Sequence, residues 1–223
     1  MSEALTLEEL DRDGAIQESV AELAGDTRAG FMRKAAIGGG AIMGSGVILG
    51  AIAPMAGAAP VPKSDVAILN FALTLEYLEA EFYTQAEKNL TDSGELMNFA
   101  KVVGRHERAH VAFLKKALGS AAVKKPRFDF KDTTSDLKKF VATAQVLEDT
   151  GVSAYLGQAG KIKNKAVLGA AASILAVEAR HAAWIRHIRG DGGSPIPAPA
   201  AFDAAKSKAQ ILAAVTGTGF IVG

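Results

Sequence analysis

The chain contains no cysteine among its 223 residues. Without thiols it cannot form disulfides, hold zinc or iron–sulfur clusters through thiolates, or use a cysteine nucleophile. Any metal that it binds must therefore be held by oxygen and imidazole ligands. Aromatic residues make up only 6% of the chain, and 24 acidic residues nearly balance 25 basic ones. A surface that follows phosphates is not expected, so nucleic acid is excluded as a partner.

Alternating runs of β-branched residues, which are typical of strands, are also scarce. From Asp65 onward the apolar residues recur at intervals of three and four, and alanine is abundant. A chain of this length can bury the core of one domain of roughly 100–200 residues and carry short additions. The sequence thus predicts an all-α protein with one principal domain.

Residues 35–59 carry no charge and are rich in glycine. They follow two basic residues and end in Ala56-Gly57-Ala58, a small-residue pattern typical of a cleavage site. A cleaved export signal is the first interpretation. A retained membrane anchor is the second, because the stretch is long enough to cross a bilayer, and a glycine-rich linker is the third. The first two predict a protein of the periplasm, cell envelope or extracellular space.

Residues 1–34 form a long leader before this stretch, and we interpret them as solvated rather than as a weak amphipathic helix. The run from Thr27 to Arg33 resembles a twin-arginine export motif. Ala29, however, stands where the second arginine belongs. The route of export therefore does not follow from the motif.

Residues 64–189 are predicted to form a four-helix bundle. Ser64 and Asp65 supply capping chemistry for the first helix, as residues 133–136 do for the third. The connections are short, long and short, which is typical of two antiparallel helix pairs joined by a crossover. The tail, residues 190–223, has a short helical pattern and is expected to pack on the bundle. The four helices are predicted to end near Asn89, Gly119, Gly160 and Arg189.

An internal repeat of polar residues is the strongest signal in the chain, because packing alone does not require it. Each half has a glutamate, a tyrosine seven residues later, and a Glu-x-x-His motif further on. The intervals between the glutamates are 31 and 30 residues. The first half contains Glu76, Tyr83, Glu107 and His110, and the second contains Glu148, Tyr155, Glu178 and His181.

The spacing of these residues explains why they would bind metal. Positions i and i+3 lie on one helix face, so each Glu-x-x-His can direct a carboxylate and an imidazole to one interior point. The lone glutamate of each half adds one carboxylate from another helix. Buried ionisable groups are costly unless they are paired or bound to metal. Four carboxylates and two imidazoles suit two Fe ions or two Mn ions.

A competing motif lies in the same region, since the segment from His106 to His110 spells H-E-x-x-H. That pattern is a signature of zinc metalloproteases, with two histidine ligands and a glutamate base. The second half has Val177 where His106 would stand, and no strand is predicted that could bind a peptide. If the repeat has one meaning, Glu107 is a ligand and His106 lies at the surface or behind the ligands. The protease remains an alternative.

The repeat resembles the ferritin-like superfamily, in particular exported bacterial ferritin-like domain proteins of the desiccation-associated type. The resemblance covers Asp65 to about Arg189. It implies that Glu107 and Glu178 are bridging or terminal carboxylates. It also implies one further carboxylate and one terminal histidine for each metal, namely Glu76, Glu148, His110 and His181.

The resemblance does not determine the reaction, because relatives oxidise iron, reduce or dismutate peroxide, or hydroxylate substrates. We expect redox chemistry on dioxygen, peroxide or ferrous iron, of the ferroxidase or peroxidase type. A manganese-catalase-like enzyme and a non-enzymatic envelope or stress-protection protein are the alternatives. Tyr83 and Tyr155 are candidates for hydrogen bonds to the ligands or for electron transfer, although packing is their simpler role. Gly104 and Gly151 lie three residues from Glu107 and Glu148, where a missing side chain could open room for dioxygen or peroxide, but close helix contact explains them as well and is the preferred interpretation.

Overall fold

The computed structural model describes residues 61–91, 94–190 and 196–222. Residues 1–34 and 35–59 lie outside the described residues, so the leader, the signal and the anchor remain predictions. Within the described residues the regular structure is helical, apart from one isolated bridge between Phe128 and Ile221. The prediction of an all-α fold is confirmed.

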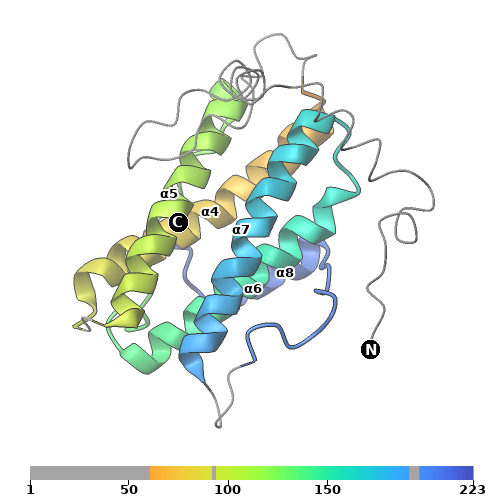
Figure 1. Cartoon of the computed structure of the whole chain (residues 1–223). Helices are drawn as coiled ribbons and strands as arrows, with labels where there is room; N and C mark the ends of the chain where they lie inside the picture. Colours follow the sequence, from red (N-terminus) through yellow and green to blue (C-terminus); the bar gives the residue numbers. More distant parts are fainter. Residues whose placement is uncertain (1–60, 92–93, 191–195, 223) are drawn as a thin grey trace, which may run out of the picture. The chain divides into compact units, whose positions relative to one another are not determined.

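Four long helices form the bundle (Figure 1). Helix α4 (Lys63–Asn89) packs against α5 (Glu95–Leu118), and α6 (Leu137–Ala159) packs against α7 (Lys165–Arg189). Each of these pairs is antiparallel and is joined by a short connection. The two pairs face each other, so each helix contributes one side to a common interior.

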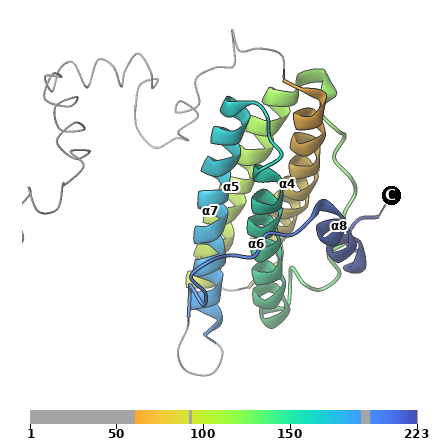
Figure 2. The same ribbon diagram turned by 90° about the vertical axis from the view of Figure 1, so that its right-hand side faces the viewer.

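A long connection, residues 119–136, links the two pairs. It begins with a 3₁₀ turn, Gly119–Ala121, and then descends along the bundle (Figure 2). Gly119 has φ +54° directly after α5, a backbone conformation that glycine adopts without steric cost. Because the connection travels the length of the bundle, α5 and α6 run in the same direction. The predicted order of short, long and short connections is present.

The start of α4 differs from the expectation. Pro62 stands at its N-cap, and no side chain caps the helix. Asp65 is instead fully buried and accepts hydrogen bonds from the backbone N–H groups of Lys163 and Asn164, just before α7. The side chain therefore ties the start of one helix pair to the start of a helix in the other. Asp136 does cap its helix, as expected.

Aromatic packing sets how α4 lies against α6 and the crossover. The ring of Phe82 stacks on Phe140 with centroids 5.3 Å apart and meets Phe130 edge-on at 5.4 Å. All three side chains are at most 1% exposed. Burial of such rings supplies a large share of the hydrophobic stabilisation of a small domain. This cluster fixes how α4 is rotated about its own axis, so that the polar face of the helix points to the interior of the bundle.

The C-terminal segment crosses α6 (Figure 2). A Cβ atom at Gly157 would lie 1.8 Å from the carbonyl oxygen of Lys206, so the close approach of the segment requires glycine there. Helix α8 (Lys208–Gly217) follows and buries Ile211 and Val215 against the core. It is the short helix that the pattern in the tail predicted.

Helix α7 is long and apolar enough, by length and composition alone, to cross a membrane. A helix in the core of a bundle meets the same criterion. Glu178 and His181 on this helix are buried among the other helices of the bundle. The hydropathy of α7 is therefore weak evidence for a membrane span.

Candidate metal centre

The six ligand residues expected from the repeat converge inside the bundle, with at least one from each of the four helices. All four glutamates are at most 1% exposed, although carboxylates are rarely buried without partners. The converging residues are Glu76 from α4, Glu107 and His110 from α5, Glu148 from α6, and Glu178 and His181 from α7.

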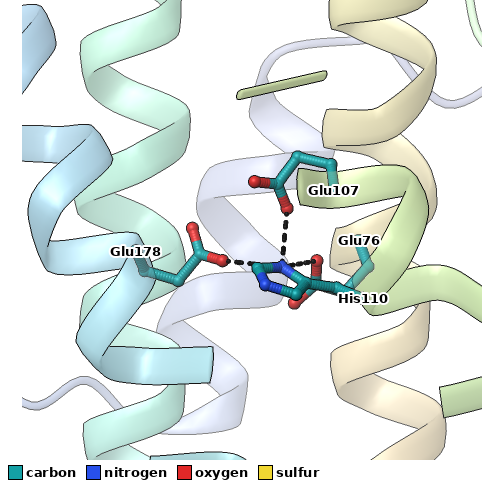
Figure 3. A group of neighbouring side chains, drawn as sticks. All are labelled: Glu76, Glu107, His110 and Glu178. Atoms are coloured by element: carbon teal, nitrogen blue, oxygen red, sulfur yellow. Dashed lines mark hydrogen bonds and ion pairs between the residues drawn. The ribbon is translucent and has the colours of Figure 1, made fainter. Parts of the chain in front are cut away.

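The first group of ligand atoms surrounds His110 (Figure 3). Its Nδ1 atom lies 3.2 Å from Glu76 Oε2, 3.1 Å from Glu107 Oε2 and 3.1 Å from Glu178 Oε1. One atom from each of these four residues lies within 4.8 Å of the others. Ligands about 2.1 Å from an ion and at right angles to one another would be about 3.0 Å apart. The spacing thus fits one ion.

The second group surrounds His181 in the same way. Its Nδ1 atom lies 3.1 Å from Glu107 Oε1, 3.2 Å from Glu148 Oε2 and 3.6 Å from Glu178 Oε2. These four residues also offer ligand atoms within 4.8 Å of one another. The second half of the repeat therefore builds the same arrangement as the first.

Glu107 and Glu178 belong to both groups. Each places one carboxylate oxygen near His110 and the other oxygen near His181. A carboxylate that divides its oxygens between two adjacent groups has the geometry of a bridge between two ions. Of the bridging and terminal roles that the resemblance implied for these two residues, the arrangement suits bridging. Glu76 and Glu148 each belong to one group only.

Three buried carboxylate oxygens in the cluster make no hydrogen bond, namely Glu107 Oε1 and both oxygens of Glu178. Histidine nitrogens lie 3.1–3.6 Å from them, within ion-pair distance. An unsatisfied buried carboxylate oxygen is costly, and in natural proteins it calls for a specific partner such as an ion. The donors are carboxylate and imidazole without thiols, which suits iron or manganese. The residues present therefore fit two such ions.

The cluster shifts the pKa of its own members. Burial and the nearby carboxylates raise the pKa of Glu107 well above its usual range, and burial raises that of Glu148 to about 7. Burial also acts on Glu178, but the two histidines outweigh it and hold its pKa at about 2. Burial alone would lower the pKa of His181, yet the carboxylates raise it to about 12. In the metal-free protein, protonated histidines thus supply the positive charge that balances the carboxylates, as bound metal would do.

Each tyrosine of the repeat donates its hydroxyl proton to the lone glutamate of the other half. Tyr83 binds Glu148, and Tyr155 binds Glu76 Oε1 at 2.5 Å. Burial and the nearby carboxylates raise the pKa of both tyrosines well above 10.0, so both remain protonated donors. These bonds cross between the helix pairs and orient the two glutamates that belong to only one group.

Glu79 is a further buried carboxylate beside the cluster, and the repeat did not reveal it. It is 3% exposed, and burial together with the charges of Glu178 and Glu148 raises its pKa well above its usual range. It follows Glu76 by three residues, the same spacing as in the Glu-x-x-His motifs. That spacing was the signal that could have found it, but the second half does not repeat it because Gly151 occupies the matching position.

The two glycines near the ligands differ in role. A Cβ atom at Gly104 would lie 2.9 Å from Tyr83 Cβ, so this glycine allows close helix contact, as expected. A Cβ atom at Gly151 would instead lie 3.4 Å from both Glu178 Oε2 and Glu79 Oε1. Gly151 therefore faces the carboxylate cluster, where side chains of two other helices come into van der Waals contact range of the position.

His106 lies behind the ligand His181. Its Nδ1 atom is 2.9 Å from His181 Nε2, and the two rings stack with centroids 5.2 Å apart. Since His181 Nδ1 faces the carboxylates, its Nε2–H is assigned as the donor to His106. Burial and the charge of His181 lower the pKa of His106 to about 4, which keeps it a neutral acceptor.

A zinc protease would need His106 and His110 on one ion. Among the described residues, His106 belongs to neither group that could hold metal, whereas Glu107 belongs to both. The geometry therefore favours Glu107 as a ligand and His106 as the partner of a ligand.

Fold and site together define a four-helix bundle with a buried carboxylate–histidine cluster that could bind metal. A family model of the ferritin-like domain matches residues 64–191, which is more than half of the chain. The protein belongs to this ferritin-like family. The comparison with curated proteins finds no match.

Proposed function

We propose that the cluster holds two iron or two manganese ions and carries out redox chemistry on dioxygen, peroxide or ferrous iron. The observation behind this proposal is that Glu107 and Glu178 each place one carboxylate oxygen near His110 and the other oxygen near His181. Two adjacent ions, when bound, can supply or accept two electrons because each changes its oxidation state by one.

The residues of the chain would hold and balance these ions. Glu107 and Glu178 would span both ions, while each lone glutamate and each histidine would bind one. Four carboxylates carry the negative charge that two divalent ions need. His110 and His181 would release protons on metal binding, because an imidazole must be neutral at the coordinating nitrogen.

Metal analysis of the full-length protein, purified without added metal, tests the proposal. We expect about two Fe or Mn ions per chain, lost in Glu107→Ala and retained in Glu81→Ala, a change on α4 outside the cluster. Spectra recorded with ferrous iron and either dioxygen or peroxide then show whether the ions turn over. A single zinc ion that is lost with His106→Ala would contradict the proposal and favour the protease. Full metal loading without either activity would favour a non-enzymatic role in the envelope or in stress protection.

We also propose that the protein is exported, on the basis of the uncharged stretch of residues 35–59. Fractionation of cells, with mass measurement of the mature chain, tests this proposal. A shortened chain in the exported fraction supports a cleaved signal, and a full-length chain in the membrane fraction supports an anchor. A full-length chain in the cytosolic fraction would contradict export.

A further inference from the structure

A small pocket lies between α4, α6 and α7, outside the ligand cluster. It offers about 20 Å³ for the centre of a water-sized molecule, and one water needs roughly 10–15 Å³ by that measure. Apolar side chains form nearly all of its wall, including Leu69 and Ala72 from α4 and Ala171 from α7. Ala171 is itself partly exposed.

Among the lining residues only Tyr155 and Gln158 carry polar side chains. The Tyr155 hydroxyl already donates to Glu76. Gln158 is 6% exposed, and its Nε2 atom makes no hydrogen bond. The pocket therefore offers a ligand one free donor and otherwise apolar contacts.

This chemistry distinguishes the small molecules that could enter. A buried water needs about two to four polar partners, and hydrogen peroxide brings two O–H donors that would both lose their partners in water. Dioxygen is of similar size, has no proton to donate, and prefers apolar surroundings. A single amide donor such as that of Gln158 does not disfavour it.

The pocket ends one side chain away from the candidate metal centre. The ring of Tyr155 lines the pocket, while its hydroxyl lies 2.5 Å from Glu76 Oε1. Leu75, the neighbour of Glu76 in the chain, lines the pocket as well. A molecule held there would therefore lie beside the first group of ligands.

We propose that this pocket binds dioxygen before it reaches the metal centre, and that dioxygen rather than peroxide is the preferred oxidant of the site. The role in oxidation rests on the proposed function, whereas binding of an apolar gas to the pocket does not require metal. The two parts can therefore be tested separately.

Xenon, a small apolar gas, probes the pocket in the full-length protein by NMR of the xenon itself. The variant Ala171→Leu fills the pocket, and Ala172→Leu makes the same change at the next, exposed position of α7. We expect saturable xenon binding in the wild type and in Ala172→Leu, and its loss in Ala171→Leu. The variant Gln158→Met should keep xenon binding, because it removes only the unpaired amide.

The same variants, loaded with ferrous iron, are then mixed with dioxygen or with peroxide in a stopped-flow instrument. We expect Ala171→Leu to slow oxidation by dioxygen several-fold, with no change in the peroxide rate or in metal content. Ala172→Leu should match the wild type in all three measurements.

Unchanged xenon binding in Ala171→Leu would overturn the proposal, as would equal slowing of the two oxidants. Loss of xenon in Gln158→Met would also count against it. If Ala171→Leu does not fold, Ile68→Trp, at a lining residue on α4, replaces it in both measurements. Absence of metal from every variant would refute the proposed function, while the xenon result would still decide whether the pocket binds gas.

Discussion

The α4–α5 and α6–α7 pairs carry the same ligands in different surroundings. His106, one residue before Glu107, has Val177 as its counterpart one residue before Glu178. Glu79 likewise has Gly151 as its counterpart. The extra carboxylate and the extra histidine of the first pair both lie against residues of the second pair. The ligand set is therefore symmetric and its supporting contacts are not, so we expect the two metal positions to differ in affinity.

The tyrosines show the same contrast. Tyr83 is surrounded by rings, with Phe82, Phe99 and Phe140 at centroid distances of 5.2, 5.8 and 6.1 Å. Tyr155 instead lines the small pocket. One side of the cluster is thus enclosed by aromatic packing, while the other borders a small pocket.

The largest expected effect separates shared from unshared ligands. Glu178→Ala should abolish binding of both ions, because Glu178 faces both histidines, whereas Glu148→Ala should leave the first group able to hold one ion. Metal content per chain, measured after equilibration with ferrous or manganous salt, checks this difference. Circular dichroism shows whether each variant is folded. Equal metal loss in the two folded variants would mean that the groups do not act as separate positions.

The next effect concerns His106, which should favour the ion beside His181. His106→Val, which copies Val177, should weaken binding of that ion by about 10–100-fold, since it removes the hydrogen bond that orients a ligand. The other ion should keep its affinity. Competition with a chelator measures both affinities, and His187→Val at the exposed end of α7 is the control. An unchanged affinity for both ions would show that the contact between the two imidazoles does not support the ligand.

The two glycines should respond differently to the same substitution. Gly104→Ala should cost about 1–3 kcal/mol of unfolding free energy, because the new methyl group meets Tyr83. Gly151→Ala makes only ordinary contacts, and the higher helix propensity of alanine, worth up to about 1 kcal/mol, offsets them. It should instead change the spectrum of the metal-loaded protein. Urea unfolding of both metal-free variants tests the first part, and a larger loss in Gly151→Ala would contradict it.

The smallest effect concerns Asp65, whose counterpart, Leu137, is 41% exposed. Burial would raise the pKa of Asp65, but hydrogen bonds from the backbone of Asn164 and Lys163 outweigh it and lower that pKa below 3.8. Because the pKa is lower in the folded state than in the unfolded state, the ionised side chain stabilises the fold at pH values above 3.8. This contribution is lost as the pH falls through the lowered pKa. Asp65→Asn should cost about 1 kcal/mol near neutral pH.

Unfolding by urea near neutral pH and at about pH 3 measures this dependence. The difference between Asp65→Asn and the wild type should shrink in acid. Ala67→Ser, at an exposed position near the start of α4, is the control. A difference that is the same at both pH values would show that the charge of Asp65 contributes nothing.

Much of the fold followed from local patterns. The interval of three and four between apolar residues predicted four helices, and their predicted ends lie within one residue of those of α4, α5, α6 and α7. The i,i+3 spacing also predicted that Glu107 with His110, and Glu178 with His181, share a helix face. Asp65 shows the limit of such arguments. The local sequence predicts that it caps α4, but its side chain accepts a hydrogen bond from Asn164, nearly a hundred residues away.

The sequence by itself determined which residues share a helix face, because 3.6 residues per turn governs every helix regardless of its neighbours. Only the tertiary structure decided which faces meet. The bonds from Tyr83 to Glu148 and from His106 to His181, and the approach of Glu79 to Gly151, join separate helices. Such contacts depend on the rotation and register of packed helices, which the interlocking of side chains sets across the whole core.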